Sequence, residues 1–144
     1  MKKRSLFVTL LALVFALMVG MPQALAADMT ADDLVKEAKQ NVCEISVSEA
    51  KGFLDNGGYI FLDCREPKEY KMGHIPGAIN LPRGLIEFKI DKAVPDKNEK
   101  IVVYCKSGGR GCLATCTLCR MGYTNVKNID GGWLAWEKAG YPID

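Results

Sequence analysis

The sequence predicts one α/β domain with a parallel sheet of about five strands and helices on both faces. At 144 residues, the chain has the length of a single globular domain. Its residues are 49% hydrophobic and 25% charged, which supports a buried core and excludes the disordered, collagenous and coiled-coil classes. Short continuous apolar runs alternate with helical patterns along the chain, as in parallel sheets whose two faces are covered by helices.

The first 26 residues have the three parts of a secretory signal peptide. Basic residues at positions 2–4 precede an uncharged, largely apolar run over 6–21, and Ala24-Leu25-Ala26 supplies a small-residue cleavage pattern. About 16 apolar residues fall short of the roughly 20 that span a bilayer, so we expect cleavage after Ala26 rather than a retained anchor. The mature protein is then expected in the periplasm or outside the cell, without a membrane partner.

The charge balance argues against one class of partner. The chain has 19 basic and 17 acidic residues, a net charge of +2, and no concentrated basic stripe of the kind that binds a phosphate backbone. We therefore expect no nucleic-acid partner. We also expect no cofactor and no bound metal, and the sequence carries no indication of the oligomeric state.

After the signal peptide, two helices are predicted. Thr30 and Asp33 have the pattern of an N-cap followed by an acidic first turn, which predicts a helix over 30–40 in an N-terminal extension assigned to 27–43. The main domain is assigned to 44–144. Ser48 is predicted to cap its first helix, which ends at the paired glycines 57 and 58.

Three apolar runs, 59–62, 101–104 and 126–129, are typical of buried strands. Prolines and glycines punctuate the chain between the first two, so we expect short helices and turns there. Helices are predicted from about 111 to 121 and over 132–139, the second anchored in the core by Trp133 and Trp136.

Cys105 is the leading candidate for a catalytic residue because it follows a predicted buried strand. Ligands bind at the carboxyl ends of strands in open parallel sheets. Gly108 and Gly109 allow the backbone to curl with its N–H groups inward, and the following helix adds its positive end. Lys106 and Arg110 add positive charge, so we expect an ionised, nucleophilic thiol near neutral pH. The alternative is a strand-end cysteine that only packs.

Several motifs, taken together, resemble the rhodanese (sulfurtransferase) family over about residues 44 to 142. In chain order they are Asp63-Cys64-Arg65-Glu66, Glu69-Tyr70, Gly73-His74-Ile75-Pro76-Gly77-Ala78-Ile79-Asn80, the loop at 104–110, Gly122-Tyr123, and Gly131-Gly132 with Trp136 and Gly140. The resemblance implies that Cys105 takes a sulfane sulfur from a donor such as thiosulfate or polysulfide, becomes a persulfide, and passes the sulfur to cyanide or a thiol. The substrate-binding loop would be Lys106, Ser107, Gly108, Gly109 and Arg110.

Two other functions compete with sulfur transfer. The loop reads C-x4-R, one residue shorter than the C-x5-R loop of related cysteine-dependent phosphatases, and leaves less room for a phosphate. A non-enzymatic module that binds or carries sulfur or metalloid species is the other alternative, although silent members of the family typically lose the loop cysteine, which this chain retains. His74, the only histidine, is interpreted as a turn residue with local hydrogen bonds rather than a catalytic base.

The Asp63-Cys64-Arg65 segment lies near the active loop in the family that the sequence resembles. We expect Asp63 to accept hydrogen bonds from the loop and Arg65 to pair nearby, so that both brace the ring of amides; the alternative is a surface ion pair. Cys64 replaces the apolar residue usual inside this motif. It is a candidate resolving thiol, one that attacks the Cys105 persulfide, forms a Cys64–Cys105 disulfide and releases the sulfur. The alternative is that the alternation of the strand turns Cys64 away from the loop into the core.

The remaining cysteines exceed what the resemblance explains. At 100° per residue, Cys112, Cys116 and Cys119 fall within about 60° of one another on one helix face. Three interpretations stay open: buried small hydrophobic residues, disulfide partners for Cys43 in an oxidising compartment, or a thiolate set for a soft metal or metalloid.

Overall fold

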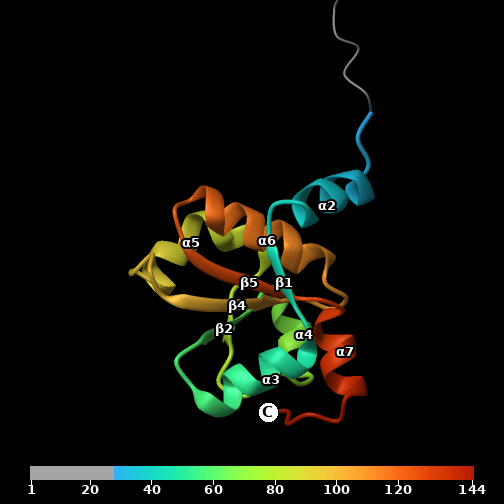
Figure 1. The fold of residues 1–144 in the computed structure, drawn as a ribbon, viewed down its shortest axis with the longest axis vertical. Coiled ribbons are helices and arrows are strands. Elements are labelled where there is room, and N and C mark those ends of the chain that lie inside the picture. Colours follow the sequence, from blue (N-terminus) through green and yellow to red (C-terminus); the bar gives the residue numbers. More distant parts are fainter. Residues whose placement is uncertain (1–27) are drawn as a thin grey trace, which may run out of the picture.

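Five parallel strands form the centre of the fold in the computed structural model, which describes residues 28–144 (Figure 1). The predicted signal peptide, residues 1–26, lies outside the described residues. The strand order is β1-β5-β4-β2-β3, and every neighbouring pair is parallel. The bounds are β1 Cys43–Ile45, β2 Ile60–Asp63, β3 Ile79–Asn80, β4 Lys100–Tyr104 and β5 Asn125–Ile129. The predicted parallel α/β class is confirmed.

Helices cover both faces of this sheet (Figure 1). In the view of Figure 1, α5 and α6 lie above the sheet, whereas α3, α4 and α7 lie below it. Among residues 28–144, no helix is long and apolar enough to cross a membrane. The helix bounds are α2 Ala31–Lys39, α3 Val47–Asn56, α4 Pro67–Lys71, η1 Arg83–Leu85, a single 3-10 turn, α5 Ile86–Ala93, α6 Gly109–Arg120 and α7 Gly132–Lys138.

The strands divide their side chains between two cores because successive residues point to opposite faces. Leu62 and Val103 belong to the core beneath α5 and α6. Phe61, Val102 and Tyr104 belong to the core that contains Trp136 of α7. Continuous apolar runs in β2 and β4 therefore mark strands buried on both sides, as the sequence predicted.

Two short edge strands, β1 and β3, were not located from the sequence. They contain three and two residues, too few for a periodic pattern, and each is defined only by its pairing with a longer strand. The cap of α3 was also placed wrongly. Ser46, not Ser48, is the N-cap: its hydroxyl accepts from the amide of Glu49, and the Glu49 carboxylate accepts from the Ser46 amide in a capping box.

The predicted N-terminal helix is present as α2, and it lies along α6 (Figure 1). Thr30 and Asp33 form a reciprocal capping box at its start. At its end, Lys39 pairs with Glu44 at 3.0 Å and with Asp130 at 3.4 Å. These two ion pairs join the end of α2 to β1 and to the residue that follows β5.

Candidate active site

Cys105 lies immediately after the central strand β4, in the turn that leads into α6. Only 1% of the residue is exposed. The amide of Gly108 donates a hydrogen bond to its Sγ at 3.2 Å, and the amides of Ser107 and Gly111 also face the sulfur. Because α6 begins at Gly109, the positive end of the helix lies at the same point. The loop is therefore a ring of N–H donors suited to an anion.

The pKa of Cys105 is lowered to about 6. The largest cause is a hydrogen bond from the thiol of Cys64; burial acts in the opposite direction, and the three loop amides lower the pKa further. A lowered pKa was expected from the amides, the helix end and the neighbouring basic side chains. The contribution of a second thiol was not.

Cys64 lies beside Cys105 because β2 and β4 are neighbours. The register pairs Asp63 with Tyr104, and the amide of Cys64 donates to the carbonyl of Tyr104 at 2.9 Å. Cys64 is completely buried and belongs to the same core cluster as Cys105. The alternation of the strand therefore turns Cys64 toward the face that carries Cys105, not away from it.

The loop is held from outside by the first turn of α7. The amide of Trp133 donates to the carbonyl of Cys105 at 2.7 Å, and that of Leu134 donates to Lys106 at 3.0 Å. Gly132 has a φ of +55°, and a Cβ at this position would collide with the Cys105 carbonyl oxygen. Glycine is required there for both conformation and space. Sequence reasoning noted the Gly131-Gly132 pair as a motif but assigned it no bracing role.

Asn128 is a second brace that sequence reasoning missed. Its side chain is fully buried, and Nδ2 donates to Glu44 at 3.0 Å and to the carbonyl of Gly108 at 3.4 Å. Its Oδ1 occupies the space where a Cβ of Gly111 would lie. A buried asparagine at a strand interior is a polar signal that could have drawn attention to it.

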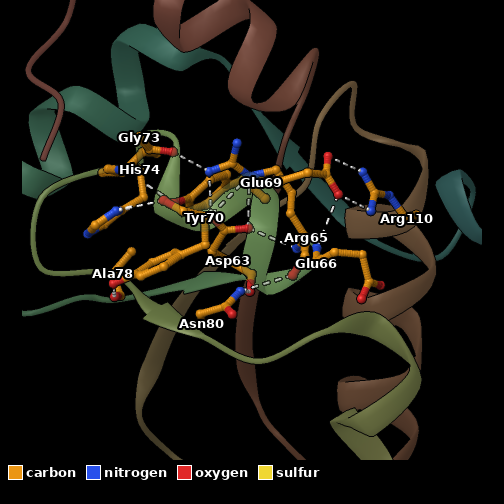
Figure 2. Close-up of polar contacts among 12 residues, drawn as sticks. Asp63, Arg65, Glu66, Glu69, Tyr70, Gly73, His74, Ala78, Asn80 and Arg110 are labelled. Carbon is orange, nitrogen blue, oxygen red and sulfur yellow. Dashed lines mark hydrogen bonds and ion pairs between the residues drawn. The ribbon is translucent and has the colours of Figure 1, made fainter.

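Asp63 and Arg65 form a buried ion pair, so the surface alternative is excluded (Figure 2). The two residues are 0% and 3% exposed, and Nη2 of Arg65 lies 2.7 Å from the carboxylate. The prediction that Asp63 accepts hydrogen bonds from the loop at 105–110 is wrong: its carboxylate accepts from the amide and guanidinium of Arg65. The reason is that Arg65, two residues after Asp63, folds back over the end of β2, so that its own amide and guanidinium occupy the carboxylate.

The guanidinium of Arg65 instead connects segments on the other side of the site. It donates to the carbonyl of Gly73 at 2.7 Å (Figure 2). Its Cζ lies 4.4 Å from the ring centroid of Trp133. Trp133 begins the turn of α7 that binds the loop carbonyls. Arg65 therefore contacts the loop indirectly, through α7.

Arg110 is paired with Glu69 rather than free for an anion (Figure 2). Its two terminal nitrogens each lie 2.9 Å from a carboxylate oxygen, the bidentate geometry of a strong ion pair. This contact holds the pKa of Glu69 at about 2, while the pKa of Arg110 is raised, chiefly by Glu69 and less by Cys105 and Cys64. Glu69 was quoted as a motif residue but not as a site residue.

Lys106 and Ser107 are exposed at the rim of the loop. An open cavity of about 260 Å³ lies beside them, lined by charged side chains and by Met72, Trp133 and Leu134. Lys106, Arg65, Glu69 and Glu137 supply the charge. Lys106 is the residue of the loop at 105–110 that lines this cavity.

His74 has the local contacts predicted for a turn residue. Its Nδ1 lies 3.1 Å from the carbonyl of Tyr70, and its ring stacks on Tyr70 at 3.7 Å (Figure 2). Its backbone exchanges two 3.0 Å hydrogen bonds with Asp144. These contacts tie the segment to the C-terminus.

The three cysteines on α6 differ in exposure. Cys112 is buried next to α2, with Sγ 3.9 Å from the carbonyl of Val35, whereas Cys116 is half-buried and Cys119 is exposed. All six cysteines, which lie within residues 28–144, are free, and Cys43 is beside Lys127. Among those residues, no three His, Cys, Asp or Glu side chains are grouped so as to hold a metal ion. Only Cys112 fits the interpretation as a buried hydrophobic residue.

Sequence comparisons find a matching family model and relatives that are named sulfurtransferases. Residues 46–139 match the model of the rhodanese-like domain. A sulfurtransferase of Allochromatium vinosum is 36% identical over 98 residues, covering 68% of this chain and 90% of that protein. The thiosulfate sulfurtransferase PspE of Escherichia coli is 42% identical over 71 residues, covering 49% and 68% of the two chains.

Solved structures agree on the fold. A protein of unknown function from Rhodopseudomonas palustris, described as a possible tyrosine phosphatase, has a TM-score of 0.76 at 31% identity and covers 87% of this chain and 100% of its own. The thiosulfate sulfurtransferase of Pseudomonas aeruginosa has a TM-score of 0.70 at 25% identity, covering 79% of this chain and 22% of that one. With a family model that matches most of its length, this chain belongs to the rhodanese-like domain family.

Proposed function

We propose that the protein is an exported, single-domain sulfurtransferase that carries sulfane sulfur as a persulfide on Cys105. The observation that carries this proposal is the buried Cys105 thiol inside a ring of backbone N–H donors, with its pKa lowered to about 6. A thiolate is the nucleophilic form of cysteine, and this one is mostly ionised at neutral pH. Export is supported by the signal-peptide pattern of residues 1–26.

The reaction has two displacements at sulfur. The Cys105 thiolate attacks the outer sulfur of thiosulfate, the bond to the sulfonate sulfur breaks, and sulfite leaves with the electron pair. The resulting terminal sulfur is anionic and lies where the loop amides stabilise it. Cyanide or a thiolate then attacks that sulfur, which leaves as thiocyanate or as a new persulfide and restores the Cys105 thiolate. Polysulfide would serve as a donor in the same way.

Two features favour sulfur over phosphate as the transferred group. The C-x4-R loop has few amides, and the Arg110 guanidinium is engaged by Glu69 through two 2.9 Å contacts. A phosphate ester needs more donors around three oxygens. A terminal sulfur needs only the ring around Cys105.

The test is thiocyanate production from thiosulfate and cyanide. We expect activity from the wild-type protein, none from Cys105→Ser, and wild-type activity from Cys43→Ser, which removes an exposed thiol on β1. A phosphate ester serves as the control substrate. Hydrolysis of that ester without thiocyanate production would refute the proposal, as would activity in Cys105→Ser.

A further inference from the structure

A second thiol, that of Cys64, lies in the same core cluster as the proposed sulfur carrier. The register pairs Leu62 with Val103 and Asp63 with Tyr104, so Cys64 and Cys105 follow as the next neighbours across β2 and β4. Neighbouring strands lie about 4.8 Å apart, and disulfides join Cα atoms about 4.4 to 6.8 Å apart. The spacing expected of two neighbouring strands is therefore within the Cα range of a disulfide.

The two thiols also share one face of the sheet and one environment. Both belong to the core beneath α5 and α6, together with Leu62 and Val103, and they are 0% and 1% exposed. No other cysteine belongs to that cluster. Cys64 is the more deeply placed of the two, with no exposed surface, and the thiol that its side chain contacts is that of Cys105.

The pKa values of the two thiols are shifted in opposite directions. The pKa of Cys64 is raised well above its usual value, mainly by its hydrogen bond to Cys105 and then by burial, whereas the pKa of Cys105 is lowered. Cys64 therefore keeps its proton while Cys105 attacks the donor. Only Cys105 of the pair is therefore the thiolate, the nucleophilic form, when the donor is attacked.

We propose that Cys64 is a resolving thiol that releases the sulfur of the Cys105 persulfide as hydrosulfide. This inference rests on the proposed function. Sγ of Cys64 attacks Sγ of Cys105, a Cys64–Cys105 disulfide forms, and the bond from Cys105 to the terminal sulfur breaks. The terminal sulfur leaves as HS⁻ with the proton of Cys64, so the negative charge of the persulfide departs and no outside oxidant is needed.

The resolved protein needs an outside reductant before the next turnover. A dithiol attacks the Cys64–Cys105 disulfide and leaves both cysteines reduced and itself oxidised to a disulfide. Summed over the cycle, the sulfane sulfur becomes hydrosulfide and the dithiol becomes a disulfide. In this proposal a dithiol is the reductant that completes the cycle, and cyanide competes for the terminal sulfur before resolution.

The experiment is a single turnover under anaerobic conditions, with protein purified after expression of the full chain. Reduced protein is mixed with one equivalent of thiosulfate and no acceptor, and intact mass, released sulfide and peptide maps are followed in time. Cys64→Val removes the resolving thiol with a side chain of similar size. Cys112→Val is the matched control, because Cys112 is equally buried but lies on α6 next to α2.

We expect the wild-type protein and Cys112→Val to gain one sulfur atom and then lose it. They end two hydrogen atoms lighter than the reduced protein, with one sulfide per chain and a Cys64–Cys105 linkage. Cys64→Val should keep its persulfide. Dithiothreitol should return all three proteins to the reduced mass, but at that step it should release sulfide only from Cys64→Val, because the wild type and the control have already lost theirs.

A stable wild-type persulfide with an unlinked Cys64, or equal sulfide release from Cys64→Val, overturns this inference and leaves the proposed function standing. A wild-type protein that shows no sulfur adduct, releases no sulfide and forms no Cys64–Cys105 linkage, together with a Cys64→Val protein that gains no sulfur, overturns the proposed function itself. The wild-type peptide map decides the question even where Cys64→Val fails to fold.

Discussion

Replacing Cys64 with valine should raise the pKa of Cys105, because the Cys64 thiol is the largest cause of its lowering. The pKa of Cys105 stands at about 6 against a usual 9.0, a stabilisation of the thiolate of roughly 4 kcal/mol. A hydrogen bond to a charged group contributes about 1.5 to 3 kcal/mol. Its loss should therefore raise the pH midpoint by about one to two pH units, with the loop amides retaining the rest.

The assay is the pH dependence of Cys105 alkylation by iodoacetamide, located by peptide mapping. Alkylation requires the thiolate, so the rate should fall as the pH drops through about 6 in the wild-type protein. In Cys64→Val the same fall should occur at higher pH. Cys112→Val should follow the wild-type curve. An unchanged midpoint in Cys64→Val would refute the argument and leave the amide ring and helix end as the sole source of the low pKa.

Three further substitutions, with Gly52→Ala as a control, test the residues around the loop. Gly132→Ala should abolish sulfur transfer and lower the free energy of unfolding, measured in urea, by about 1 to 3 kcal/mol, because the new Cβ collides with the Cys105 carbonyl oxygen and φ is positive at this residue. The control Gly52→Ala lies at an open helical position of α3 and should leave the free energy of unfolding unchanged or raise it. Asp63→Asn should cost about 3 to 5 kcal/mol in the same assay, since it leaves the buried Arg65 without its counter-charge, and a loss below about 1 kcal/mol would contradict that role. Glu69→Gln should change stability by less than about 1 kcal/mol because the pair is partly exposed, yet lower the KM for thiosulfate by releasing the charge of Arg110; an unchanged KM would show that Arg110 does not reach the donor.

The strands and helices of the middle of the chain were predictable because their apolar runs are continuous. Residues 101–104 read as a buried strand, and they form most of β4. The two edge strands were not predictable, since β3 is only Ile79–Asn80 and exists by pairing with β2. The cap of α3 was recoverable from the sequence. Ser46 and Glu49 have the spacing of a capping box, and Ser48 does not.

The site was predictable where its chemistry is local and not where it depends on packing. Cys105 and its glycine-bearing loop are contiguous, so the sequence alone indicated a ring of amides. The contacts of Trp133 and Asn128 with that loop join segments at least 20 residues apart along the chain. The pairing of Arg110 with Glu69 likewise depends on how α4 lies against the start of α6. No periodicity in a single sequence records such contacts.

The central claim is that sulfur travels on Cys105, and the most direct measurement is to find it there. The protein is incubated with thiosulfate, alkylated without reduction, digested, and the peptide that contains Cys105 is weighed before and after cyanide. The account predicts one additional sulfur atom on Cys105, or its release as sulfide with a Cys64–Cys105 linkage, and thiocyanate when cyanide is present from the start. An unmodified, unlinked Cys105, or sulfur carried on another cysteine, would contradict it.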